Sequence, residues 1–141
     1  MEKNKMTAAD YPLTSKRGGE IKTPTGKMLE DITLEKVLSG EIGADDIRIS
    51  PETLEMQAQI AESMNRDAIA RNFRRAAELI KVPDDRILEM YNALRPYRST
   101  KEELFEMADE LEHKYGAKVN ADFVREAAEV YENRNKLRIE E

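Results

Sequence analysis

Several residue types that often carry chemistry are scarce or missing in this sequence of 141 residues. Cysteine and tryptophan are absent, histidine occurs once, and aromatic residues make up 6% of the chain. Without cysteine there are no disulfides and no thiolate metal sites. A single histidine also excludes a site built from several imidazoles. We expect that histidine, His113, to lie on the surface, because it falls on the outer side of its predicted helix relative to Leu111 and Tyr115.

Long apolar runs are missing as well. No stretch approaches the ~18 apolar residues that a membrane-spanning helix requires. The N-terminal sequence MEKNKMTAADYPL lacks the apolar segment of a signal peptide, so we expect a cytoplasmic protein. The net charge of −6 disfavours a nucleic-acid partner. With 37% charged residues, the chain is either a very soluble domain or a subunit that completes its burial against a partner, and composition favours the first.

The first thirty residues differ from the rest of the chain. Pro12 and Pro24 lack an amide donor, and glycines interrupt any helix. We therefore expect an extended N-terminal arm over residues 1–30 and a single helical domain over residues 31–141. The arm either frays or lies along another surface.

Local signals predict helices through the remaining chain. Ser50 followed by Pro51 is typical of a helix start, and residues 65–67 favour a kink or a break in the long pattern that follows. A further helix starts at residue 84. Ser99 and Glu102 form a capping-box pattern for the next helix, which ends at Gly116.

No alternation typical of strands is present, so we predict an all-α, mainly helical fold with about five or six helices. We expect Asn120 to cap the last helix and the charged tail KLRIEE to fray.

Positive charge is concentrated in residues 66–98, which carry eight basic and five acidic side chains. Arg71, Arg74 and Arg75 lie opposite the apolar positions of their helix. They are candidate interface residues. The alternative is a solvated face in which Arg74 pairs with Glu78 four residues later.

The run YNALRPYR over residues 91–98 is a second candidate interface. Tyr91, Arg95, Tyr97 and Arg98 are of the residue types enriched at interaction hot spots. The alternative is that Tyr91 belongs to the core and the rest is an ordinary loop.

Reactive motifs are absent. Thr25-Gly26-Lys27 lacks the other glycine and the Ser/Thr of a phosphate-binding loop, and the acidic doublets fall near helix starts. We therefore predict no catalytic, cofactor-binding or metal-binding residues in this chain.

Long segments nevertheless resemble a known family. These segments are TPTGKMLEDITLEKVLSGEIG, DIRISPETLEMQAQIAE, ARNFRRAAELIKVPDDRILEMYNALRPYRSTKEEL and ADFVREAAEVYENRNKLR. Together they closely resemble the small (γ) subunit of adenosylcobalamin-dependent glycerol and diol dehydratases, from about residue 10 to residue 138.

The resemblance implies a non-catalytic subunit of a hydro-lyase. Such enzymes are dimers of αβγ heterotrimers, in which the large (α) subunit holds the substrate and the medium (β) subunit, with the large one, binds adenosylcobalamin. They eliminate water from glycerol or 1,2-propanediol by a radical route to give an aldehyde. The small subunit packs on the large one, in the cytoplasm or within a bacterial microcompartment.

Two further expectations remain. The segment TPTGK…DITLEKVLSGE, and the lack of the longer N-terminal extension of compartment-associated diol enzymes, favour the glycerol enzyme, whereas PDDRILEMYNALRPYRSTKEEL resembles the diol enzyme equally well. As an alternative function, the chain is a freestanding helical adaptor that binds an acidic partner through Arg66, Arg71, Arg74 and Arg75.

Overall fold

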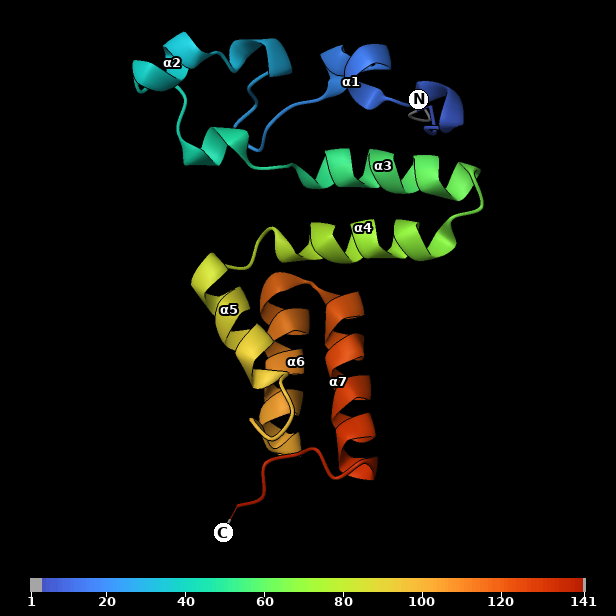
Figure 1. The fold of residues 1–141 in the computed structure, drawn as a ribbon, viewed down its shortest axis with the longest axis vertical. Coiled ribbons are helices and arrows are strands. Elements are labelled where there is room, and N and C mark those ends of the chain that lie inside the picture. Colours follow the sequence, from blue (N-terminus) through green and yellow to red (C-terminus); the bar gives the residue numbers. More distant parts are fainter. Residues whose placement is uncertain (1–3, 141) are drawn as a thin grey trace. The chain divides into compact units, whose positions relative to one another are not determined.

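The computed structural model describes residues 4–140, and this part of the chain is helical (Figure 1). It contains seven α-helices and no strand apart from an isolated bridge between Lys22 and Met28. The predicted all-α class is therefore confirmed. The seven include a short helix, α1 (Leu13–Lys16), within the predicted arm. None of the helices in the described range is long and apolar enough to cross a membrane.

The chain divides into two compact units, Met1–Ala77 and Glu78–Glu141. The prediction of an arm over residues 1–30 and a domain over residues 31–141 stays a prediction.

The first unit is built on two neighbouring helices, α3 (Pro51–Ser63) and α4 (Asp67–Leu79), whose last turn enters the second unit. The Ser50 side chain caps α3, and Pro51 takes its first position, as predicted. The predicted break also forms, because Asn65 adopts a positive φ of 59° that continues neither helix. Ala58, Ala61 and Ala70 from these two helices are buried in one small cluster, and Phe73 packs against it.

Residues 4–50 of the first unit form short helical turns and loops. Beyond α1 they contain the helix α2 (Leu34–Leu38) and four 3₁₀ turns, which are η1 (Ala8–Asp10), η2 (Gly18–Glu20), η3 (Leu29–Asp31) and η4 (Ala44–Ile47). The Met6 amide donates to Gln59 Oε1 at 2.8 Å, and Met6 and Leu13 are buried against Ile60. The beginning of the predicted arm thus lies along α3, and it contains short helical turns.

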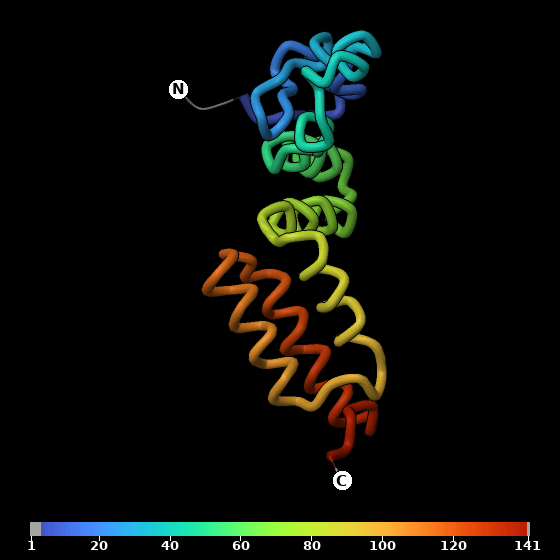
Figure 2. The backbone as a smooth tube through the Cα atoms, turned by 90° about the vertical axis from the view of Figure 1, so that its left-hand side faces the viewer, coloured from blue at the N-terminus to red at the C-terminus, as the bar shows by residue number. Residues whose placement is uncertain are grey.

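The second unit contains α5 (Asp84–Ala93), α6 (Lys101–Tyr115) and α7 (Lys118–Asn133). The helices α6 and α7 form an antiparallel hairpin (Figure 2), and Gly116 ends α6 with a φ of 66° as predicted. The largest buried cluster of the chain lies here. It consists of Val82, Met90, Leu104, Met107, Ala108, Leu111, Ala117, Ala121, Val124 and Ala128.

Two predicted details of α6 and α7 are wrong. The capping box uses Thr100 and Glu103, one residue later than predicted, while the Ser99 hydroxyl donates to the Ala93 carbonyl at 2.8 Å. The last helix begins at Lys118, so Asn120 lies inside its first turn and is not its cap.

Candidate subunit interface

The three arginines predicted on α4 have different surroundings. Arg71 is exposed and forms no side-chain ion pair with the described residues. Arg75 is half-buried and interacts with other parts of the described chain. Arg74 binds two carboxylates of α3: its Nε and Nη2 donate to Glu55, each at 3.0 Å, and its Nη1 donates to Glu62. Arg74 therefore already has partners within the first unit.

The position of these glutamates explains the arrangement around Arg74. Glu55 and Glu62 are seven residues apart, so they lie two turns apart on one face of α3. Hydrogen bonds from Arg74 lower the pKa of both carboxyl groups below the ordinary glutamate value. The cluster stabilises the pairing of α3 with α4.

The alternative pair between Arg74 and Glu78 does not form. Glu78 instead accepts hydrogen bonds at the start of α7, from the amides of Val119 and Asn120 at 3.1 and 3.0 Å. It also accepts from the Asn120 side-chain amide at 2.8 Å. The prediction is wrong because Glu55 and Glu62 occupy the Arg74 guanidinium, while the free amides at a helix N-terminus attract the Glu78 carboxylate.

The outer face of α5 presents Tyr91 to solvent. Tyr91 is 69% exposed and Leu88, three residues earlier, is 62% exposed. The buried side of α5 is formed by Met90, with Ile87 and Leu94 packed against the same cluster. The alternative that Tyr91 belongs to the core is therefore wrong, and its exposure is compatible with an interface role.

The turn after α5 is held by the C-terminal tail. The Tyr97 amide donates to the Lys136 carbonyl at 2.7 Å, and the Arg138 amide donates to the Ser99 carbonyl at 2.8 Å. Lys136 Nζ lies 5.0 Å from the centre of the Tyr97 ring and donates to its hydroxyl at 2.8 Å. Residues 136–138 are thus docked on the turn, contrary to the predicted fraying. The turn is ordered before any partner binds.

The seven predicted interface residues therefore fall into two groups. Arg71, Arg74 and Arg75 belong to the first unit, and the other four belong to the second. In the second group the side chains are exposed, and those of Arg95 and Arg98 form no ion pair with described residues. The role of all seven in an interface stays a prediction.

Residues 29–49 contain exposed apolar side chains that were not predicted from the sequence. On α2, Leu34 is 74% exposed and Leu38 is 79% exposed, with Val37 exposed between them. Their i, i+3, i+4 spacing was visible in the sequence, but it predicts a buried face as readily as an exposed one.

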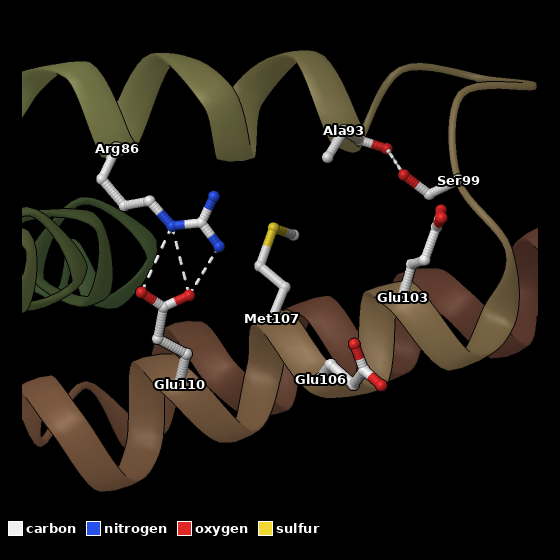
Figure 3. A pocket seen from close by; sticks show the side chains of 7 residues that line it. All are labelled: Arg86, Ala93, Ser99, Glu103, Glu106, Met107 and Glu110. Carbon is white, nitrogen blue, oxygen red and sulfur yellow. Dashed lines mark hydrogen bonds and ion pairs between the residues drawn. The ribbon is translucent and has the colours of Figure 1, made fainter.

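A pocket of about 340 Å³ lies between α5 and α6 (Figure 3). Arg86 on α5 donates to the Glu110 carboxylate on α6, with its Nη2 2.5 Å from Oε2, and also to Glu89 at 2.7 Å. Hydrogen bonds from Arg86 lower the pKa of Glu110. The ion pair between Arg86 and Glu110 thus links α5 to α6, while Glu106, which also lines the pocket, forms no ion pair with the described residues.

A second pocket, of about 740 Å³, lies in the first unit and is lined by polar and apolar residues of the N-terminal segment and α3, Met6 and Met56 among them. Binding sites for large organic cofactors are mostly apolar, with few polar groups. That no residue of this chain binds a cofactor stays a prediction. Within residues 4–140, no group of three or more His, Asp or Glu side chains is arranged to hold a metal ion.

Comparisons with known proteins place the chain in a family. Residues 6–138 match the family described as dehydratase small subunit. The propanediol dehydratase small subunit of Salmonella typhimurium is 61% identical over 130 residues, which cover 92% of this chain and 75% of that protein. The protein of the same name from Citrobacter freundii is 60% identical over 129 residues, with the same coverage. Neither name supports the predicted preference for the glycerol enzyme, and neither supports a freestanding adaptor.

Proposed function

Because the chain belongs to the dehydratase small-subunit family, we propose that it is the non-catalytic small subunit of a coenzyme B12-dependent glycerol or propanediol dehydratase. The observation that carries the proposal is the 61% identity to a propanediol dehydratase small subunit over 92% of the chain. A small subunit has other dehydratase subunits as partners. The complex eliminates water from 1,2-propanediol or glycerol and leaves an aldehyde.

The division of labour between subunits is part of the proposal. The large subunit holds the substrate, and the large and medium subunits together bind adenosylcobalamin, which supplies the radical chemistry. The residues of this chain contribute to the assembly of the complex. We place the holoenzyme, a dimer of αβγ heterotrimers, in the cytoplasm, either free or within a bacterial microcompartment.

The exposed turn at residues 95–98, with Tyr91 beside it on the chain, is the proposed docking surface of the second unit. Tyrosine and arginine combine apolar area with directional hydrogen bonds, and both are enriched at hot spots. The tail orders this turn in advance through Lys136. A pre-ordered surface loses less conformational entropy on binding than a mobile one.

The first test is the assembly of the complex with and without this chain. The three subunits are co-expressed, and dehydration of 1,2-propanediol and of glycerol is measured with added adenosylcobalamin. We expect this chain to co-purify with the two larger subunits and activity to fall when it is omitted. Full, stable activity in a complex that lacks it would overturn the proposed function.

The second test concerns the docking surface. Tyr97→Ala combined with Arg98→Ala should weaken association with the larger subunits by about tenfold or more, because both side chains contribute exposed contact area. The helical circular dichroism of the free chain should change little. Arg134→Ala, at an exposed arginine of the same unit, is the control. Association at the wild-type level by the double variant would refute a docking role for this turn.

A further inference from the structure

Residues 29–49, hereafter the acidic apolar segment, carry an unusual number of large apolar side chains that face solvent. Six large apolar side chains of this segment are exposed, and four of them lie on α2 or within η4. Among these four, Leu34 is 74% exposed, Leu38 is 79% exposed and Ile47 is 64% exposed. The full set is Leu29, Leu34, Val37, Leu38, Ile47 and Ile49. Isolated exposed apolar residues are ordinary, but a concentration within 21 residues is typical of an interaction site.

The local structure of this segment is well defined. The Thr33 hydroxyl accepts from the Lys36 amide at 3.3 Å and caps α2, and Gly40 ends it with a φ of 80°. Ile42, two residues after Gly40, is buried, and its amide donates to the Lys36 carbonyl at 3.1 Å. Leu34, Val37 and Leu38 are therefore held on one face of a fixed turn of helix.

Charge determines which partner fits this face. The segment contains six acidic and two basic side chains. Both basic groups already have acidic partners within it: Lys36 pairs with Asp31 at 3.4 Å, and Arg48 pairs with Asp45 at 3.5 Å. Glu30, Glu35 and Glu41 are exposed and form no ion pair with the described residues.

This charge excludes several occupants. A second copy of the chain would bring a segment of the same net negative charge against it, and like charges placed opposite one another disfavour binding. Anionic lipid headgroups and nucleic acids are repelled for the same reason. The partner must therefore combine an apolar surface with a basic rim.

We propose that the acidic apolar segment is a second docking surface, which binds an apolar site rimmed by lysine and arginine on another subunit of the dehydratase. It is distinct from the turn at residues 95–98, which lies in the other compact unit. The inference rests on the proposed function, since that function supplies the partner. It explains why apolar side chains on a fixed helix remain open to solvent in the free chain.

The apolar part is tested with Leu34→Ser combined with Leu38→Ser in the full chain, using the large and medium dehydratase subunits as the binding partners. We expect the dissociation constant to rise by about tenfold or more, because both side chains lose contact area that the partner buries. The control is Ile139→Ser, since Ile139 is 86% exposed and lies outside the segment. Circular dichroism should show the same helicity in all three chains.

The electrostatic part is tested with Glu30→Gln, Glu35→Gln and Glu41→Gln combined. Removal of three charges should weaken binding and reduce its dependence on salt, because screening acts on charges that face the partner. If binding by this triple variant depends on salt as strongly as binding by the wild type does, the proposal of a basic rim on the partner is overturned.

The outcomes separate this inference from the proposed function. If the wild-type chain does not bind the larger subunits at all, both fall. If the wild type binds and the Leu34/Leu38 variant binds equally well, only this inference falls. A wild-type dimer in sedimentation that the same variant abolishes would also overturn it, because the occupant would then be a second copy of the chain.

Discussion

Glu78 shows how one side chain joins two elements. Its carboxylate accepts from the amides of Val119 and Asn120 and from the Asn120 side chain, which is buried. We expect Glu78→Ala to lower the free energy of unfolding by about 1–2 kcal/mol, because these donors lose their acceptor at the start of α7. Urea denaturation followed by circular dichroism measures this loss.

A matched control is available on α6. Glu106 is exposed and forms no ion pair with the described residues, so Glu106→Ala should change stability by no more than about 0.5 kcal/mol. Equal losses in the two variants would show that Glu78 does not act as a cap.

The predicted interface residues show that the sequence indicates the exposure of single side chains better than it indicates their ion-pair partners. The exposure of Arg71, Arg95 and Arg98 follows from their polarity and from the helical pattern. The capture of Arg74 by Glu55 and Glu62 could not be predicted, because it depends on which face of α3 meets α4. Single-helix rules consider partners three or four residues away, whereas these glutamates are 19 and 12 residues distant.

At the scale of elements, the helix ends were predictable where residues with strong capping or backbone preferences mark them. Ser50 with Pro51, the positive φ of Asn65 and that of Gly116 set helix ends where they were predicted. The inward face of α7 was less predictable. Phe123 is 45% exposed, whereas its neighbour Val124 is 2% exposed. Alanine at positions 121 and 128 lets α6 approach closely. The buried face of α7 therefore contains Val124 and not the larger neighbouring side chain of Phe123.

The contact between α3 and α4 should depend on pH through the Arg74 cluster. The pKa of both Glu55 and Glu62 is lower in the folded chain because Arg74 binds their ionised forms. The stabilisation is therefore present above the ordinary glutamate pKa of about 4.3 and is lost as the pH falls toward the lowered values. We expect the stability difference between wild type and Arg74→Met to be largest near neutral pH and to shrink on acidification.

Urea denaturation of both proteins at a series of pH values, from about 7 down to about 3, measures this difference across the titration range. Arg71→Met removes the same charge from α4 at an exposed position without a described ion pair. Its effect should be small at every pH. If the stability difference between wild type and Arg74→Met stays constant with pH, the Arg74 cluster does not stabilise the fold through ionised carboxylates.

At the scale of the whole molecule, composition favoured a very soluble domain over a subunit that completes its burial against a partner. The structure contains three small buried clusters, and the largest of them lies in the second unit. Exposed apolar side chains in both units are consistent with a subunit that completes its burial against a partner. The sequence could not reveal this, because a short amphipathic turn such as α2 has the same pattern whether a core or a partner covers it.

The two proposed docking surfaces lead to a prediction about their combination. Leu34→Ser/Leu38→Ser changes the first unit and Tyr97→Ala/Arg98→Ala changes the second. If each surface binds its own site on the larger subunits, the losses of binding free energy in the quadruple variant should add within about 0.5 kcal/mol. Titration of the larger subunits with wild type, both double variants and the quadruple variant completes the cycle. A deviation of more than about 1 kcal/mol would show coupling between the two contacts. They would then have to be described as one continuous interface.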